Sequence, residues 1–175
     1  MSLAAKSLLL IAVLGLAACN NPDRYGAGGA GGAGGAGGAG GIDTTGLGDP
    51  NNPTSIAYFN QTVGDRVLFA VDQSTLTPEG RGILTAQANW LNQNTGYAAI
   101  IEGHADEQGT REYNLALGAR RAAAVQNFLI SQGVAANRLR TISYGKERPL
   151  EVCSEEACYA KNRRAVTVLS AGVGA

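Results

Sequence analysis

One stretch of the sequence, residues 101–122, carries the residue types best suited to binding a charged ligand. Asp106 follows an apolar run, and Asn114 and Arg121 lie beyond it, in a segment with helical character. Because Asn114 and Arg121 are seven residues apart, which is two helical turns, both side chains project from roughly the same face. Gly118 lies between them, and its small size would let a ligand approach. A carboxylate and a guanidinium held apart on rigid elements predict a site for a zwitterion.

A second interpretation of this stretch is catalytic. Glu102, His104 and Asp106 are spaced by two, so an extended backbone would point all three side chains to one side. Such a cluster could hold a hard metal ion or act as acid and base, as in a hydrolase. The sequence has one histidine and no evident nucleophile–base pair, which argues against catalysis. We therefore expect no enzyme activity, no metal and no cofactor, and we expect His104 to hydrogen-bond locally and hold the turn of Asp106.

The elements that must position these residues alternate between strand and helix. Runs rich in β-forming residues predict strands, and apolar residues that recur every three or four positions predict helices. Pro78 suits the first position of a helix capped by Thr77, and Gly133 suits the end of the longest helix. The alternation predicts an α/β fold, with a mixed four-stranded sheet and helices packed on one face. The expected strands are 66–71, 97–102, 138–144 and 164–169, and the expected helices are 78–92, 110–132 and 155–162. The longest helix is expected to bury Leu115, Ala122, Val125 and Leu129.

Charge and cysteine content narrow the function further. The chain has 14 basic and 14 acidic residues, so nucleic acid is not an expected partner. Cys153 and Cys158 lie five residues apart in a polar segment, and in an exported protein such a pair favours a disulfide. Metal binding is the rival interpretation, but it needs more ligands than one histidine and two thiols supply.

The beginning of the chain has the pattern of a targeting segment. Lys6 precedes a short apolar run that is too short to span a membrane, and Leu16-Ala17-Ala18 comes directly before Cys19. This ending resembles a bacterial lipobox, in which the cysteine becomes the lipidated first residue of the mature protein. Asn20 in place of Asp favours sorting to the outer membrane, by the same resemblance. The alternative is a soluble secreted protein in which Cys19 is incidental.

A tether and one domain follow the signal. Residues 26–41 consist only of glycine and alanine, which bury no large apolar surface, so a flexible chain is expected there. We divide the sequence into a signal peptide (1–18), a lipidated N-terminus with its tether (19–62), one domain (63–170) and a tail (171–175). A glycine-rich coil of about 45 residues has a root-mean-square reach of roughly 35 to 40 Å. A domain anchored in this way could reach a structure beneath the membrane.

Several spaced blocks of the domain resemble one known family. These are Gly103-His104-Ala105-Asp106-Glu107, Tyr113-Asn114-Leu115, the run 117–122 and the run 161–166. They resemble the OmpA-like peptidoglycan-binding domain, over about residues 63–170. The form of the first and last blocks and the run 143–149 are similar to those of the peptidoglycan-associated lipoproteins within that family.

The resemblance implies a role for two charged residues. Asp106 matches the residue that binds the free amine of diaminopimelate in peptidoglycan stems, and Arg121 matches the arginine that grips the carboxylate of the same ligand. A guanidinium suits a carboxylate because two parallel hydrogen bonds form. Asp106 could otherwise be a helix cap, although Thr110 is better placed for that, and Arg121 could be an ordinary surface arginine. Arg120 and Arg138 are expected on the solvated surface.

Five further residues join the site by the same resemblance. Asn114 is implied as a ligand contact, and Arg163 as a second partner for the carboxylate. Phe69 and Asp72 match a Phe-x-x-Asp pattern of the family and could line the pocket, although Phe69 could equally belong to the core. Ala105 lies in the Asp106 block and is included in the set.

The resemblance also implies a function and partners. It implies a non-enzymatic outer-membrane lipoprotein whose domain faces the periplasm, binds peptidoglycan and tethers the outer membrane to the cell wall. It further implies membership of the Tol-Pal system, a role in cell division, and contact with the β-propeller protein TolB that overlaps the wall-binding face. The alternatives are a periplasmic cell-wall hydrolase that uses Glu102, His104 and Asp106, and a module that binds only proteins.

Overall fold

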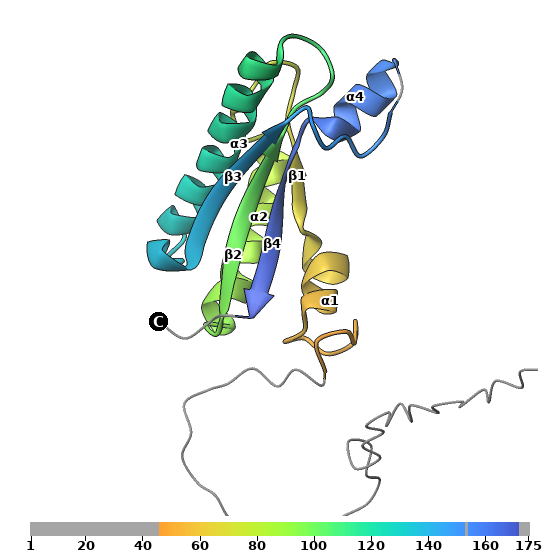
Figure 1. Cartoon of the computed structure of the whole chain (residues 1–175). Helices are drawn as coiled ribbons and strands as arrows, with labels where there is room; N and C mark the ends of the chain where they lie inside the picture. Colours follow the sequence, from red (N-terminus) through yellow and green to blue (C-terminus); the bar gives the residue numbers. More distant parts are fainter. Residues whose placement is uncertain (1–45, 153, 172–175) are drawn as a thin grey trace, which may run out of the picture. The chain divides into compact units, whose positions relative to one another are not determined.

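A mixed four-stranded sheet forms the centre of the domain. The computed structural model describes residues 46–152 and 154–171, and the sheet has the order β1-β4-β2-β3. Its strands are β1 (Arg66–Leu68), β2 (Tyr97–His104), β3 (Leu139–Gly145) and β4 (Arg164–Ala171). β2 and β3 run parallel, and β4 is antiparallel to both of its neighbours, β1 and β2. Helices α2 and α3 lie on one face, and the other face is turned toward the viewer in Figure 1. The predicted α/β fold is therefore confirmed.

The two long helices begin where the sequence predicts. α2 (Pro78–Gln93) is capped by Thr77, whose hydroxyl accepts from the N–H of Gly80, and α3 (Arg111–Ser131) is capped by Thr110 in the same way. A hydroxyl at this position satisfies one of the backbone donors that a helix start leaves free. Gly133 ends the segment after α3 with a φ of 93°, a value that glycine adopts without steric cost.

The buried face of α3 differs from the prediction at one position. Ala122, Val125 and Leu129 are buried as expected, but Leu115 is 48% exposed. Leu117 takes its place, and the polar residues Asn114 and Arg121 complete the buried face. An assignment by hydrophobicity alone leaves these two polar residues at the surface, which shifts the expected face and wrongly buries Leu115.

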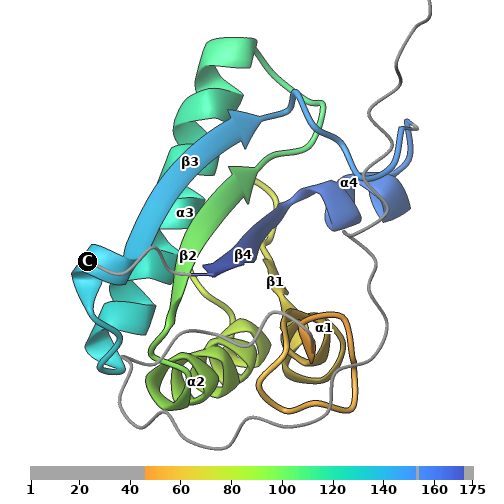
Figure 2. The same cartoon turned by 60° about the horizontal axis from the view of Figure 1, so that its bottom comes forward.

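The domain begins earlier than predicted. Residues 46–62 were assigned to the tether, but α1 (Ile56–Tyr58) and the π-helical segment η3 (Phe59–Gly64) pack beside α2 (Figure 2). Phe59 is fully buried and packs on the ring of Trp90. The indole N–H of Trp90 donates to the carbonyl of Pro53 at 2.8 Å. This segment covers one end of the core, so the tether prediction is wrong over residues 46–62. Residues 1–45, which include the predicted signal and Cys19, lie outside the described residues.

The remaining elements follow the prediction, with different bounds. β1 ends at Leu68 rather than at residue 71, because Ala70 and Gln73 close a turn in which Asp72 has a φ of 56°. A short 3₁₀ helix, η4 (Ala136–Arg138), precedes β3, and α4 (Glu156–Asn162) precedes β4. Among the described residues, no helix is both long enough and apolar enough to cross a membrane.

Arg138 is a structural residue and not the surface arginine that was expected. Its guanidinium donates to the carbonyls of Leu91 and Asn94 at the end of α2 and to that of Tyr97 at the start of β2. It thus satisfies carbonyls that the helix end leaves without partners. The surface expectation is wrong because composition does not reveal which arginine lies beside a helix end.

Two glycines let α3 lie directly on the sheet. A Cβ at Gly103 in β2 would come within 1.9 Å of the carbonyl oxygen of Gly118 in α3. A Cβ at Gly118 would meet the hydroxyl oxygen of Ser143 at 2.4 Å and the carbonyl oxygen of Gly103 at 2.8 Å. Gly118 is therefore required by the strand beneath it, and the expectation that it makes room for a ligand is wrong. This close contact fixes α3 relative to the end of β2, where the candidate site begins.

Candidate functional site

The residues predicted to bind a ligand gather at one end of the sheet. β1 and β2 end there and β4 starts there, at the top of Figure 1. Asp106 lies in the loop after β2, Asp72 in the loop after β1, and Arg163 between α4 and β4. The backbone N–H of Phe69 donates to the carbonyl of Arg163 at 2.9 Å, which joins the loop after β1 to the segment before β4. The site thus combines segments that are far apart in the sequence.

Asp106 and Arg163 form a buried ion pair. Oδ2 of Asp106 lies 3.1 Å from Nη1 of Arg163, and both side chains are almost completely covered. Arg163 also pairs with the exposed carboxylate of Glu156 in α4. Burial lowers the pKa of Arg163, but the hydrogen bonds to Glu156 and Asp106 outweigh burial and raise it above its ordinary value. Arg163 is therefore charged and bound to two carboxylates, one buried and one facing solvent.

Arg121 lies beneath the site rather than on its surface. Its side chain has no exposed area, and its guanidinium donates to the carbonyls of Gln73 at 2.8 Å, His104 at 2.8 Å and Ala70 at 3.2 Å. Burial lowers the pKa of Arg121 to about 10, although the charge of Asp106 opposes this effect. Arg121 thus joins the loop after β1 to the end of β2. The prediction that Asn114 and Arg121 share one face of the helix is correct, but that face is buried.

Phe69 belongs to the core, and Asp72 to the surface. The ring of Phe69 is buried, and the guanidinium carbon of Arg121 lies 5.1 Å from its centroid. Asp72 is exposed, and its carboxylate accepts a hydrogen bond from the hydroxyl of Tyr113 at the start of α3. This contact fastens the loop after β1 across the Arg121 guanidinium. Tyr113 has no predicted role, although it directly precedes Asn114 in the block that resembles the family.

Asn114 and Ala105 hold the loop after β2. The amide nitrogen of Asn114 donates to the carbonyl of Gln108 at 2.6 Å, and the N–H of Ala105 donates to the carbonyl of Gly145 at 2.8 Å. Both residues are buried. Lys146 adds to this support because its ammonium donates to the carbonyls of Glu107 and Gly109. These contacts fix the backbone that carries Asp106. Asn114 and Ala105 therefore hold the Asp106 carboxylate in position.

Glu102, His104 and Asp106 do not point to one side. A register shift falls between Gly103 and His104, and the backbone leaves the strand before it reaches Asp106. Glu102 and His104 face the open side of the sheet, where Nε2 of His104 lies 3.6 Å from Oε2 of Glu102, whereas Asp106 binds Arg163. The expected hydrogen bond from the ring of His104 is also wrong, because both ring nitrogens are buried and neither has a hydrogen-bond partner among the described residues. It is the backbone carbonyl of His104 that holds the site, through Arg121.

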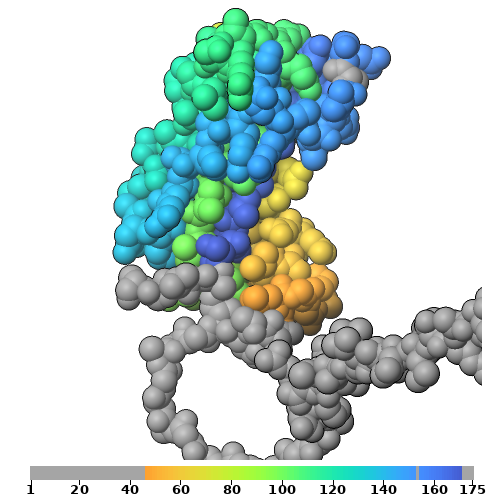
Figure 3. Space-filling model, in the orientation of Figure 1, coloured from red at the N-terminus to blue at the C-terminus, as the bar shows by residue number. Residues whose placement is uncertain are grey.

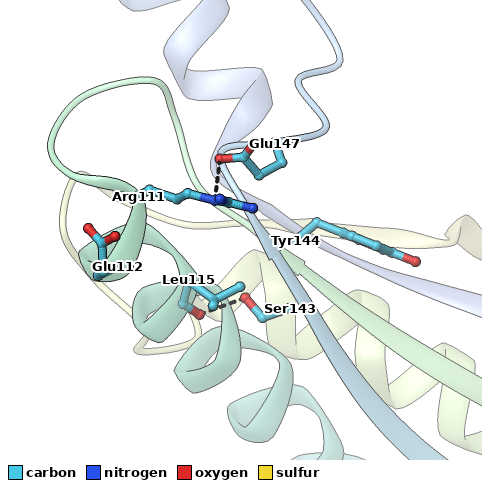
Figure 4. A pocket seen from close by; sticks show the side chains of 6 residues that line it. All are labelled: Arg111, Glu112, Leu115, Ser143, Tyr144 and Glu147. Atoms are coloured by element: carbon cyan, nitrogen blue, oxygen red, sulfur yellow. Dashed lines mark hydrogen bonds and ion pairs between the residues drawn. The ribbon is translucent and has the colours of Figure 1, made fainter.

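A groove of about 440 Å³ lies between α3 and the end of β3. Nε of Arg111 lies 3.3 Å from Oε1 of Glu147, and this ion pair is drawn as a dashed line between two lining residues in Figure 4. Leu115 projects into the groove, which explains why this leucine is exposed despite its apolar side chain. Tyr144 and Ser143 line the side formed by β3. The groove shares no residue with the pair of Asp106 and Arg163.

The described residues contain no group of three or more histidine, cysteine and acidic side chains placed to hold a metal ion. Cys158 takes part in a disulfide bond. Cys153, its expected partner, lies outside the described residues, so the pairing of the two stays a prediction.

One protein-family model matches the part of the chain that contains the candidate site. A model described as the OmpA family matches residues 68–163, which include both members of the Asp106–Arg163 pair and all of α2, α3, β2 and β3. The chain belongs to the OmpA family. The match begins at the end of β1 and stops just before β4, so it covers the segments that build the site.

Similar proteins within the OmpA family carry the same name. A protein of Mesorhizobium japonicum named peptidoglycan-associated lipoprotein is 58% identical over 118 residues, which cover 67% of this chain and 70% of that protein. One of Haemophilus influenzae with the same name is 40% identical over 162 residues, 92% of this chain and 95% of that protein. The crystal structure of the peptidoglycan-associated lipoprotein from Burkholderia pseudomallei matches with a TM-score of 0.62 at 35% identity, over 71% of this chain and 98% of that one. These relatives are named as lipoproteins and not as enzymes.

Proposed function

We propose that the protein is an outer-membrane lipoprotein that binds peptidoglycan without a covalent bond and tethers the outer membrane to the cell wall. The names of its relatives support both parts of this proposal, the lipid anchor and the ligand. The pattern that ends at Cys19 supports the anchor independently. By the same resemblance, the protein acts in the Tol-Pal system, contacts TolB and supports cell division.

The observation that carries the binding proposal is the buried pair of Asp106 and Arg163, which opens to solvent through Glu156. A stem peptide that ends in diaminopimelate presents an ammonium and a carboxylate on one carbon. The ammonium binds Asp106, and the carboxylate binds Arg163 in place of Glu156. A ligand of this kind keeps both protein charges paired, which favours its entry into a site that has little water.

Arg121 takes part as a second partner of the ligand carboxylate. It is covered in the free protein, and its longest contact is the hydrogen bond to the carbonyl of Ala70. A carboxylate that replaces this carbonyl gives Arg121 a charged acceptor, which forms the stronger hydrogen bond. The exchange requires the loop held by Asp72 and Tyr113 to move. Phe69, Asn114 and Ala105 keep the ligand-binding groups in place.

Binding of purified cell wall to the whole chain tests the proposal. Asp106→Asn should weaken sedimentation with the wall by about thirtyfold or more, because a desolvated charge pair that loses one side costs about 2 to 5 kcal/mol. Glu156→Gln is the matched control, since it removes the exposed partner of Arg163 and leaves Asp106 in place. It should bind at least as well as the native chain. Thermal unfolding of each variant separates lost binding from lost structure.

The ligand itself can be varied as well. A stem peptide with lysine in place of diaminopimelate keeps the amine but lacks the distal carboxylate. Isothermal titration should show that the native chain binds the lysine stem much more weakly than the diaminopimelate stem. Equal affinities would contradict the proposed carboxylate contacts of Arg163 and Arg121, and recognition would then rest on another part of the wall.

A further inference from the structure

The open face of the sheet carries a set of exposed apolar side chains that the proposed function does not use. Four large apolar residues, one from each strand, are between 38% and 50% exposed there: Leu68, Ile100, Ile142 and Val168. Their strand neighbours Val67, Ile101 and Leu169 point to the other face and are buried under the helices. A sheet in an α/β domain usually buries its apolar faces against other elements. On this face, the described part of the chain supplies no helix.

The strand register groups Ile100, Ile142 and Val168 around Glu102, whereas Leu68 lies opposite the buried Arg164. Ile100 is the partner of Val168 across β2 and β4, and Ile142 is the partner of Glu102 across β2 and β3. Val166 adjoins Glu102 on the other side. Directly opposite residues in a sheet have their Cβ atoms about 5 Å apart, so Ile100 adjoins Val168, whereas Glu102 lies between Ile142 and Val166. Figure 3 shows this face toward the viewer, with β2, β3 and β4 side by side. We call these four residues, with their neighbours Arg66, Arg140 and Glu102, the open-face patch.

Arginines flank the patch on both sides. Arg140 is the partner of Ile100 on the β3 side, and Arg66 is the partner of Val166 on the β1 side. Arg66 is paired with Asp65, whereas Arg140 forms no ion pair with any described residue. Beyond the patch, the guanidinium of Arg148 stacks 3.7 Å from the ring centroid of Tyr144. Arg140 therefore leaves an unpaired positive charge on the β3 side of the apolar surface, and the β1 side carries an arginine that Asp65 already pairs.

We propose that the open-face patch docks an amphipathic helix of a partner protein that has carboxylates on both sides of its apolar face. The strands that carry Arg66 and Arg140 are separated by three strand spacings, about 14 Å. A helix with its side chains is about 10 to 12 Å wide, so it fits between the two arginines. Acidic residues along both flanks of the helix then meet the arginines, and its apolar stripe covers Ile100, Ile142 and Val168.

Other occupants fit the patch less well. A second copy of this chain would bring the same arginines face to face across a two-fold axis, which like charges oppose. Residues 19–45 of the chain contain only Tyr25 and Ile42 as large apolar side chains, too few to cover four. A lipid bilayer would remove water from Glu102 without offering it a partner, at a high cost in free energy. A protein helix can place a hydroxyl or an ammonium beside that carboxylate.

Two designed peptides of about 18 residues, a helix of about 27 Å, provide the test. Both carry leucine at helical spacing on one face, and one has glutamates along the flanks where the other has lysines. The protein is the whole chain labelled with ¹⁵N and carrying Cys19→Ser, so that no lipid is attached. Amide shifts of the open-face patch should report binding of the acidic peptide, and the lysine peptide should bind at least about tenfold more weakly because its charges oppose the arginines.

The patch offers matched control variants. Ile100→Thr and Arg140→Glu should each weaken the acidic peptide by about fivefold or more, since each removes a contact with one side of the helix. Ile130 on α3 is exposed to the same 38% as Ile100, and Arg120 is exposed on the same helix. Ile130→Thr and Arg120→Glu should therefore leave the affinity within about twofold. Asp106→Asn should also leave it unchanged, which separates this surface from the proposed wall-binding site.

Three results would overturn the inference. The first is equal binding of the acidic and basic peptides, or equal loss in the patch variants and their controls. The second is binding of the Cys19→Ser chain to phosphatidylglycerol vesicles that depends on Ile100, because the surface would then recognise a membrane. The third is a concentration-dependent dimer in sedimentation that Ile100→Thr abolishes, because the patch would then bind a second copy.

Discussion

Arg121 is the residue whose structural surroundings differ most from its expected role. Its position two turns after Asn114 predicts a ligand contact, yet three backbone carbonyls already accept hydrogen bonds from its guanidinium. A buried cation bound to carbonyls stabilises the loops that supply them, and its removal leaves those carbonyls without donors. The same side chain can therefore affect binding and stability together. A binding experiment on Arg121 alone cannot distinguish the two effects.

The first prediction concerns this arginine. Arg121→Ala should lower the free energy of unfolding by about 3 kcal/mol or more, because it leaves buried carbonyls unpaired and a cavity beside Phe69. Equilibrium unfolding in urea measures the change. Arg120→Ala, next to it on the exposed side of α3, should change the free energy by less than about 0.5 kcal/mol. Equal stability of the two variants would show that the three hydrogen bonds of Arg121 do not hold the loops.

The second prediction concerns His104 and pH. Burial, together with the charges of Arg164 and Arg148, lowers its pKa from the ordinary 6.5 to about 4. Between pH 6.5 and pH 4, His104 is protonated in the unfolded chain and neutral in the folded chain. The free energy of unfolding is therefore highest above pH 6.5 and falls as the pH drops toward 4. From pH 7.5 to pH 5 the loss attributed to His104 should be about 2 kcal/mol.

Unfolding in urea at the two pH values measures this loss. His104→Gln keeps a polar side chain of similar size but cannot titrate, so the difference between pH 7.5 and pH 5 should become smaller. An unchanged difference in the variant would assign the pH dependence to other groups.

The site residues divide into those that sequence reasoning finds and those it does not. Asp106 and Arg163 come from separate blocks, and the fold brings them within 3.1 Å of each other. Glu156 lacks any signal of its own because an exposed glutamate is a common residue, and Tyr113 is indicated only by the block that resembles the family. Their roles depend on distances between loops far apart in the sequence, and local patterns carry no such information.

At the scale of elements, the contact between α3 and β2 has the strictest steric requirement. Gly103 and Gly118 allow the helix backbone to approach the strand backbone, and a Cβ at Gly103 would overlap a carbonyl oxygen. The overlapping group is backbone, so it cannot relieve the clash by changing rotamer. A single methyl group should therefore displace the whole helix.

This contact gives the third prediction. Gly103→Ala should lower the free energy of unfolding by about 3 kcal/mol, since the overpacked helix must shift away from the sheet. Gly82→Ala in α2 is the matched control, because nothing lies within 4 Å of its Cβ position. That variant should gain about 0.5 to 1 kcal/mol, because alanine loses less entropy than glycine in a helix. Thermal or urea unfolding measures both, and a stable Gly103→Ala would mean that α3 and β2 are not held this closely.

The type and order of the helices and strands were predictable from the sequence, whereas the residues at which they begin and end were less predictable. The four strands and the helices α2 and α3 follow from periodicity and from the caps Thr77 and Thr110. β1 is shorter than predicted because the alternation of residues 66–71 continues through a turn. The packed segment over residues 46–62 was not predicted because it has little regular periodicity, and its stability comes from Phe59 and from contacts between η3 and α2. Tertiary contacts fixed these segments, and a local pattern cannot predict such contacts.

At the scale of the whole molecule, the domain has two separate surfaces with different chemistry. At the end of the sheet, the positive charge of Arg163 lies between the negative charges of Asp106 and Glu156. The open face carries apolar residues bordered by arginines. If the end of the sheet binds the cell wall, as proposed, the open face stays available to a partner. The two surfaces can then act together, provided that the domain is attached to the membrane.

The last prediction tests that attachment. Replacing Cys19 by serine removes the proposed site of acylation, and stable attachment needs two or more acyl chains. The Cys19→Ser protein should therefore leave the outer-membrane fraction and be found in the soluble fraction or as an uncleaved precursor. Asn20→Asp serves as the control, because it keeps the cysteine and resembles the signal for retention at the inner membrane. It should stay membrane-bound but move to the inner-membrane fraction on a sucrose gradient. Recovery of Cys19→Ser firmly in outer membranes would show that the anchor lies elsewhere in the chain.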